Sequence, residues 1–181
     1  RVLFRSGLDR LPGVTIESTH YVNTPYGSPS AAIACGRLGE VPVAFLPRHG
    51  PDHTLPPHLI NYRANIWGLS QVADAVIAVA AVGGINGAMA PGDIVIVDQV
   101  VDYTWGREHT FWDGEASEVL HVDFTSPYSA SVRESLDQAA ERAALTIHAQ
   151  GTYAATQGPR LESAAEIDRL ERDGCDVVGM T

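Results

Sequence analysis

Hydrophobic positions along the first half of the chain follow two different periods. Three short runs are apolar or β-branched and are bounded by Gly, Pro and Asn, which is typical of strands: Val14–Val22, Ser30–Gly36 and Val41–Leu46. Ile60–Val72 follows a pair of prolines and has apolar residues at helical spacing. Ala75–Val82 (AVIAVAAV) is apolar throughout, a pattern that predicts a strand covered on both faces of a parallel sheet.

The second half continues this alternation of strands and helices. The pattern predicts a strand at Asp93–Gln99, a long functional loop at Tyr103–Pro127, a helix at Ala130–Leu145, a strand at Thr146–Ala155, a capped helix at Ser163–Asp173 and a strand at Asp176–Met180. Such alternation predicts a single-domain α/β fold with a mixed, largely parallel central sheet flanked by helices. Ligands of such sheets bind at the carboxyl ends of the strands.

Composition narrows the kind of partner. The chain has 181 residues and a formal net charge of −10, with two cysteines, Cys35 and Cys175, that form no CxxC pair. The acidic balance argues against binding of nucleic acid or an anionic membrane, so an anionic ligand needs a local group of cations. No apolar run is long enough to span a membrane, and the cysteine usage fits a reduced cytoplasm.

Both ends of the sequence have unusual features. Residues 1–6 (RVLFRS) have no signal-peptide pattern, and LFRS can be encoded by the end of a common sequencing adapter. The other end, DVVGMT, stops at the exit of a predicted buried strand. We therefore expect residues 1–6 to be non-native, and residues 7–181 to be a partial domain truncated at both ends.

The loop Phe45–His58 (FLPRHGPDHTLPPH) concentrates histidines in a chain that has few of them. His49 and His53 have the spacing of helical zinc ligands, but the intervening Gly50 and Pro51 exclude a regular helix, so no metal site is predicted. The histidines are also compatible with an ordinary polar loop.

Binding of an anion is the interpretation with more support. Arg48 comes directly after a predicted strand, where its guanidinium can hold a phosphate with two hydrogen bonds, and His49 adds a donor. Val82–Gly84 ends another predicted strand with glycines that let backbone N–H groups approach an anion. The Thr181 hydroxyl follows a third strand.

These residues belong to motifs that resemble the trimeric purine nucleoside phosphorylase family, and within it the methylthioadenosine/methylthioinosine phosphorylase branch. The motifs occur in family order: PRHGPDHTLPPHLINYRANIW, AAVGGI, PGDIVIVDQVVDYTWGREHTF, TQGPRLES and DVVGMT. The resemblance implies phosphorolysis of a purine nucleoside, with inorganic phosphate as co-substrate and no cofactor. It also implies a homotrimer.

The resemblance assigns roles residue by residue. The phosphate-binding residues it implies are Arg48, His49, Ala80, Ala81 and Thr181. The nucleoside-binding residues are Gly83, Leu161, Glu162, Met180, His53 and His121, with His53 beside the 5′ substituent and His121 contributed to the neighbouring subunit. Positioning and electrostatics then carry most of the catalysis, without a separate catalytic residue.

Glu162 is the residue that points to a substrate class. It can be an exposed residue that favours the start of the next helix through the helix dipole. Alternatively, an ionised carboxylate accepts the N1–H of a 6-oxopurine but opposes the N1 lone pair of adenine. The branch that cleaves 6-aminopurines usually has a small hydroxyl residue at this position. Within the branch that the chain resembles, Glu162 therefore favours a methylthioinosine-type phosphorylase over a methylthioadenosine one.

Several alternatives remain open at this stage. They are phosphorolysis of S-methyl-5′-thioadenosine or of inosine and guanosine, a non-catalytic purine- or phosphate-binding fragment, and a metallohydrolase that uses the histidine loop. The chain departs from the family pattern in its glycine-rich phosphate loop, of which only Gly7 matches, and in the base-binding Asn or Asp that the family carries beyond the position of Thr181.

Overall fold

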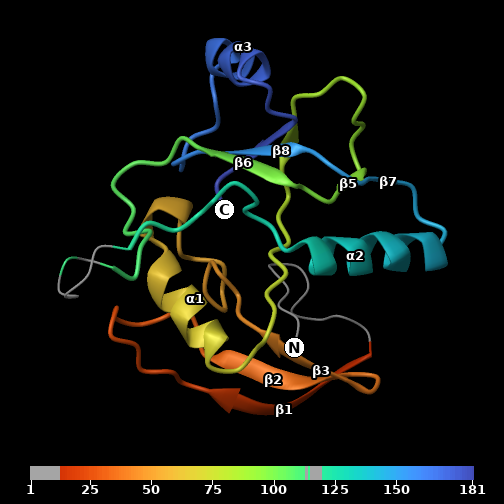
Figure 1. The fold of residues 1–181 in the computed structure, drawn as a ribbon. Coiled ribbons are helices and arrows are strands. Elements are labelled where there is room, and N and C mark those ends of the chain that lie inside the picture. The colour runs from red at the N-terminus through yellow and green to blue at the C-terminus, as the bar shows by residue number, and fades with distance from the viewer. Residues whose placement is uncertain (1–12, 113, 115–119) are drawn as a thin grey trace. The chain divides into compact units, whose positions relative to one another are not determined.

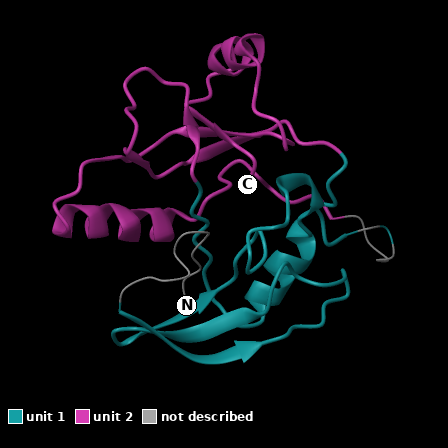
Figure 2. Ribbon diagram, turned by 180° about the vertical axis from the view of Figure 1, so that it is seen from behind, with its two compact units in different colours: residues 1–80, 106–119 teal, residues 81–105, 120–181 magenta. Residues whose placement is uncertain are grey.

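The computed structural model describes residues 13–112, 114 and 120–181. The chain divides into two compact units: unit 1 contains residues 1–80 and 106–119, and unit 2 contains residues 81–105 and 120–181 (Figure 2). We describe each unit by itself. The strands are β1 (Val14–His20), β2 (Ile33–Leu38), β3 (Val41–Phe45), β4 (Gly83–Gly84), β5 (Ile94–Val95), β6 (Gln99–Asp102), β7 (Ile147–His148), β8 (Thr152–Ala155) and β9 (Val177–Gly179). The helices are α1 (Tyr62–Ser70), α2 (Ala130–Arg142) and α3 (Ala164–Arg172), with a short 3₁₀ turn at Pro57–Leu59 (Figure 1).

Unit 1 contains an antiparallel sheet in the order β1-β2-β3. All three strands were predicted from the hydrophobic pattern, and their ends differ by a few residues from the prediction. Strand β1 is irregular between Ile16 and Ser18, where its register against β2 shifts. Gly36 lies opposite this point, and a Cβ there would collide with the carbonyl oxygen of Thr15. The close approach of β1 and β2 therefore requires glycine at this position.

The core of unit 1 joins this sheet to α1. Ile33, Cys35, Ala44, Leu46 and Leu69 form one buried cluster. The helix begins at an N-cap, Asn61, whose side chain accepts a hydrogen bond from the Ala64 N–H. The predicted helix Ile60–Val72 is thus confirmed with shorter ends.

Unit 2 is built on a mixed sheet in the order β4-β9-β8-β6. Strands β6, β8 and β9 are parallel to one another, and β4 pairs with β9 in the antiparallel sense. One face packs against α3, where Ala154, Leu170, Cys175 and Val178 form a buried cluster. On the other face, Tyr153, Ala155 and Val177 pack against four partly buried residues, Met89, Val95, Val97 and Val100. The mixed α/β fold that the sequence predicted is confirmed.

The predicted buried strand at Ala75–Val82 is wrong. The structure describes all of residues 75–82 and gives them no strand; the next strand, β4, begins just beyond them at Gly83. Val76, Val79 and Val82 are 37–40% exposed. An apolar run indicates a need for burial, but it does not identify the strand that would form backbone hydrogen bonds with it. No described strand pairs with this run.

Two other predicted strands are each split in two. Asp93–Gln99 contains β5 and the start of β6, and Thr146–Ala155 contains β7 and β8. The break falls where Asp98 and Gly151 meet, because the Asp98 carboxylate accepts a hydrogen bond from the Gly151 N–H at 2.9 Å. A side chain that competes for the backbone N–H ends the regular ladder on both strands.

Some expectations lie outside the described residues. These are the non-native origin of residues 1–6, the family match of Gly7, and part of the loop Tyr103–Pro127.

In the described part of that loop, Arg63 of α1 donates to the Glu108 carboxylate at 2.7 Å and lies over the Tyr26 ring. Within the described ranges, no helix has the length and apolar character that crossing a membrane requires.

Asn65 provides a test of the unit 1 core. It is 4% exposed, and its side-chain amide accepts from the Ser30 N–H at 2.7 Å and donates to the Ser30 hydroxyl at 2.9 Å. We expect Asn65→Ala to lower the free energy of unfolding by about 1–3 kcal/mol, because it leaves buried polar groups of Ser30 without these partners. Urea denaturation followed by tryptophan fluorescence measures the loss. The control is Gln71→Ala, at an exposed position, and an equal small effect of both substitutions would contradict the prediction.

Candidate functional site

The carboxyl ends of β8 and β9 lie side by side because the two strands are parallel and adjacent. Thr156 follows β8 directly, and its N–H donates to the Gly179 carbonyl at 2.8 Å, which extends the ladder by one bond. Met180 and Thr181 follow β9. Sequence reasoning placed Glu162, Met180 and Thr181 in the site, and the structure brings all three to this edge of unit 2.

Glu162 lies in the irregular segment between β8 and α3. It is half-buried, and its Oε1 atom accepts a hydrogen bond from the Thr156 hydroxyl at 2.7 Å. The segment turns sharply at Gly158, which has φ +63° and precedes a cis peptide bond to Pro159. A Cβ at Gly158 would collide with the Met180 thioether, so the turn packs directly on Met180.

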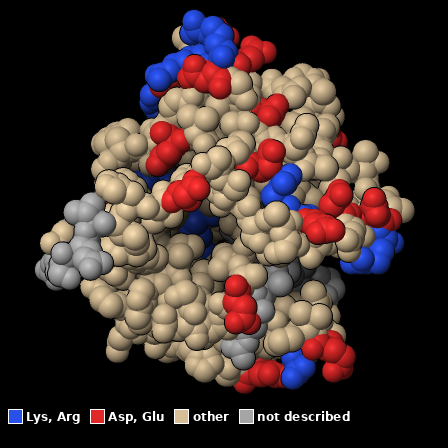
Figure 3. Space-filling view, viewed as in Figure 1, with Lys and Arg blue, Asp and Glu red and all other residues tan. Residues whose placement is uncertain are grey.

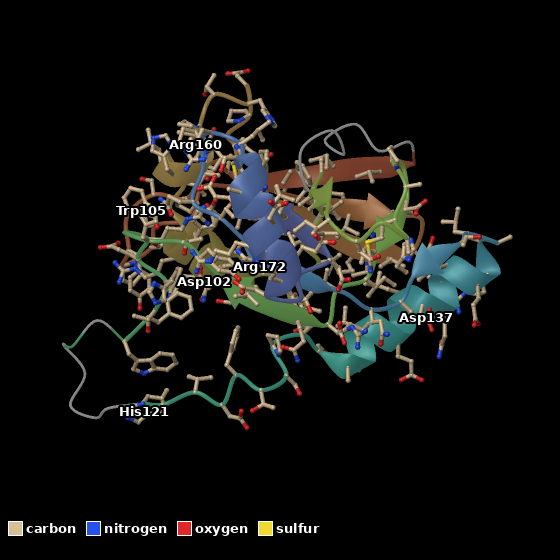
Figure 4. All side chains as sticks on the ribbon, turned by 90° about the horizontal axis from the view of Figure 1, so that it is seen from above. Asp102, Trp105, His121, Asp137, Arg160 and Arg172 are labelled. Atoms are coloured by element: carbon tan, nitrogen blue, oxygen red, sulfur yellow. The ribbon has the colours of Figure 1, made fainter. Side chains whose placement is uncertain are left out.

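A pocket of about 260 Å³ opens beside Glu162 in unit 2. Aromatic, amide, hydroxyl and charged side chains line it, and Trp105 and Arg160 are labelled in Figure 4. The complete lining is Tyr103, Trp105, Thr156, Gln157, Gly158, Arg160, Glu162, Glu166, Arg169 and Leu170. The pocket thus combines flat apolar surfaces with a hydrogen-bond acceptor, a combination that suits a heteroaromatic ring.

Arg160 and Glu166 form an ion pair beside this pocket. Their guanidinium and carboxylate make two contacts of 2.8 Å, and Glu166 also forms the capping box of α3 with Ser163. The Arg160 hydrogen bond, followed by those from the Ser163 backbone and side chain, lowers the pKa of Glu166 from its ordinary value near 4.5 to about 2. The capping box was predicted from the sequence, whereas the ion pair was not.

Charges of both signs alternate along α3. Acidic and basic side chains are interspersed over this helix at the top of Figure 3, and they come from Glu166, Asp168, Arg169, Glu171 and Arg172. The surface beside the pocket therefore carries both positive and negative charges.

Thr181 is held through its backbone. Its N–H donates to the Tyr153 hydroxyl at 2.9 Å, and Tyr153 is only 7% exposed. Gly179 lies against the same hydroxyl, and a Cβ at that glycine would collide with it. Tyr153 therefore fixes the path of the chain from β9 to Thr181, which sequence reasoning did not indicate.

In unit 1, the side chains of the predicted pair, Arg48 and His49, contact each other. His49 is 7% exposed, and its Nδ1 lies 2.8 Å from the Leu55 carbonyl, so this nitrogen is the protonated donor. Its Nε2 lies 3.4 Å from the Arg48 guanidinium, and its ring stacks on exposed His53 at 4.6 Å between centroids. One ring nitrogen of His49 thus bonds a carbonyl, and the other faces the Arg48 cation.

The other predicted residues are less enclosed. Leu161 is 79% exposed, His121 is exposed on the irregular segment before α2 (Figure 4), and Ala80, Ala81 and Gly83 lie in or beside the poorly buried segment after residue 74. Ala80 belongs to unit 1 and Ala81 to unit 2. Among the residues that the structure describes, no group of three or more His, Cys, Asp or Glu side chains is arranged to hold a metal ion.

Comparison with known proteins decides the family. The family model described as the phosphorylase superfamily matches residues 7–181. The chain belongs to the phosphorylase superfamily.

The similar proteins in this superfamily are named as phosphorylases of purine nucleosides or their methylthio analogues. A probable S-methyl-5′-thioinosine phosphorylase of Pseudomonas syringae pv. tomato is 51% identical, over 97% of this chain and 72% of the relative. A 6-oxopurine nucleoside phosphorylase of Pyrococcus furiosus is also 51% identical, over 88% of this chain and 62% of the relative. The solved methylthioadenosine phosphorylase of Schistosoma mansoni in complex with tubercidin matches with a TM-score of 0.93 at 32% identity, over 99% of this chain and 71% of that one.

The ion pair at the pocket gives a pH-dependent prediction. Because the pKa of Glu166 is lowered in the folded state, ionised Glu166 stabilises the protein above pH 4.5, and this contribution is lost as the pH falls from 4.5 towards 2. We expect Arg160→Gln to raise the pKa of Glu166 towards 4.5, measured by NMR titration of its side-chain carboxyl. The control is Arg172→Gln, since Arg172 donates to the Asp168 carbonyl and not to Glu166. A Glu166 that still titrates near pH 2 in Arg160→Gln would show that Arg160 is not the cause.

Proposed function

We propose that this chain belongs to a pentosyltransferase that cleaves S-methyl-5′-thioinosine with inorganic phosphate. The C1′–N9 bond of the nucleoside breaks, a C1′–O bond to phosphate forms, and the base takes up a proton. The products are hypoxanthine and 5-methylthioribose 1-phosphate. Phosphate is a co-substrate, and we propose no other cofactor.

The observation that carries this proposal is the environment of the Glu162 carboxylate. Glu162 lines the pocket, and its Oε1 accepts from Thr156, while within the described residues no hydrogen bond reaches Oε2. Oε2 is therefore an acceptor that can take the N1–H of a 6-oxopurine. Adenine presents a lone pair at N1, so it would leave this acceptor unpaired and repelled. Relatives named for thioinosine and 6-oxopurine substrates support the same preference.

Each unit, taken by itself, offers a candidate donor for phosphate. In unit 1, Arg48 is a permanent cation with a planar set of N–H donors, and His49 lies against it. In unit 2, Thr181 offers a hydroxyl at a strand end whose backbone Tyr153 fixes. Stabilisation of a ribosyl cation between phosphate and the departing base then depends on position and charge.

The oligomer and compartment belong to the same proposal. We assign a homotrimer in which His121 completes the site of a neighbouring copy, which agrees with the exposure of His121 in the single chain. We place the enzyme in the cytoplasm, since Cys35 and Cys175 are both buried thiols and reducing compartments preserve thiols.

Substitution of Glu162 tests the substrate class. We expect Glu162→Ser to lower kcat/KM for S-methyl-5′-thioinosine by roughly 10- to 100-fold, the effect of losing one hydrogen bond to a charged group. Activity towards S-methyl-5′-thioadenosine should be kept or should rise. The assay measures release of hypoxanthine and adenine by the full-length gene product, with and without phosphate.

The control for this experiment is Glu171→Ser, an exposed carboxylate on α3. Equal selectivity of Glu162→Ser and the unsubstituted enzyme would refute the role of Glu162. Release of base without phosphate would refute phosphorolysis and favour a hydrolase.

Substitution of Arg48 tests the phosphate assignment. We expect Arg48→Lys to raise the KM for phosphate about 10-fold or more, because an ammonium group cannot reproduce two parallel N–H donors. The matched control is Arg37→Lys, since Arg37 lies half-exposed on β2 and pairs with Glu17. Steady-state kinetics with phosphate varied at saturating nucleoside give both constants. An unchanged KM for phosphate would remove Arg48 from the site.

A further inference from the structure

Thr156 follows β8 directly and lies beside the irregular segment that forms part of the pocket wall. Its N–H donates to the Gly179 carbonyl at 2.8 Å and thereby continues the pairing of β8 and β9. Its side chain is β-branched, so few rotamers are open to it. Among the described residues, Glu162 Oε1 at 2.7 Å and the Gly179 carbonyl at 3.3 Å both lie within reach of the hydroxyl proton. The shorter distance is the usual one for an O–H···O hydrogen bond, so Glu162 is the principal acceptor.

Glu162 needs such a hydrogen-bond partner in order to distinguish one purine base from another. It has several rotatable bonds and lies in an irregular segment whose preceding residue, Leu161, is 79% exposed. A freely rotating carboxylate loses rotamer entropy when it binds a base, and this loss weakens binding. A hydrogen bond to Oε1 from a fixed hydroxyl restricts the carboxylate before the base arrives and presents Oε2 as the remaining acceptor.

Arg160 also lies near Glu162, but it does not supply this restraint. Its guanidinium makes two 2.8 Å contacts with Glu166, and its side chain is 72% exposed. Arg160 interacts with Glu162 through its charge, and no hydrogen bond joins the two within the described residues. Thr156 is thus the hydrogen-bond donor that sets the orientation of the carboxylate.

We infer that Thr156 is a positioning residue for substrate selection: its hydroxyl orients Glu162 to accept the N1–H of a 6-oxopurine. The inference rests on the proposed function, because it gives Glu162 its role through the purine base. Thr156 acts on the selection of the base through Glu162. It ties the side chain that selects the base to the backbone at Gly179, immediately before Met180 and Thr181.

The test compares two substitutions of Thr156. Thr156→Val keeps the shape of the side chain and removes the donor, whereas Thr156→Ser keeps the donor. We expect Thr156→Val to lower the ratio of kcat/KM for S-methyl-5′-thioinosine over S-methyl-5′-thioadenosine by roughly 10-fold or more. Thr156→Ser should stay within about 3-fold of the unsubstituted full-length enzyme, since it restores the hydrogen bond. A merely structural role of Thr156 would alter both substrates alike and leave the ratio unchanged.

A double-substitution cycle with Glu162→Ser separates the inference from the proposed function. If Thr156 acts through Glu162, adding Thr156→Val to Glu162→Ser changes the ratio no further. If the two effects multiply fully, or if Thr156→Val alone leaves the ratio unchanged, the inference fails while the role of Glu162 stands. If Glu162→Ser alone leaves the ratio unchanged, the proposed function fails. Thermal unfolding of each variant confirms that the compared proteins are folded, and Thr156→Ala replaces Thr156→Val if the valine variant is not.

Discussion

The parallel pairing of β8 and β9 is the interaction on which the site in unit 2 depends. Asp176, just before β9, sets its register: the carboxylate accepts from the Thr152 N–H and the Asn86 amide, both at 2.8 Å. The Asp176 carbonyl also accepts from the N–H groups of Ile85 and Asn86, so the chain after β4 is tied to the same residue. Because the register is fixed at the beginning of the strands, their carboxyl ends coincide. Residues far apart in the sequence, Glu162 and Thr181 among them, therefore reach one edge.

Close packing at that edge leaves few choices of residue. Gly179 has no room for a Cβ beside the Tyr153 hydroxyl, and Gly158 has none beside Met180. The turn at Gly158 also has a positive φ, which glycine adopts without strain. Glycine at 179 lets β9 lie against Tyr153 of β8, and glycine at 158 lets the segment before α3 pack on Met180. The capping box of Ser163 and Glu166 then starts α3 immediately after Glu162 and fixes the backbone on that side.

The sequence was informative where a local pattern determines the structure. The three strands of unit 1 and the capping box of α3 both follow from local spacing. Ala75–Val82 shows the limit, because its apolar pattern reports a need for burial and cannot identify a pairing partner. The break at Asp98 and Gly151 depends on a hydrogen bond between segments about 50 residues apart in sequence. The contact of Thr156 with Glu162 depends on the path of the turn between them, which neither residue encodes by its type.

An acidic chain can bind a phosphate anion if attraction is local and repulsion is distant. At physiological ionic strength, charges in solvent are screened beyond roughly 8 Å, so most of the net charge of −10 has little effect on a bound anion. A guanidinium in direct contact with phosphate is hardly screened, and its hydrogen bonds are stronger because they carry charge. Glu162 follows the same rule with the opposite sign. Its carboxylate attracts only a donor that reaches contact distance, and the Thr156 hydroxyl that donates to Oε1 carries no charge of its own. Charges of opposite sign in one acidic chain can therefore each attract their own partner at short range.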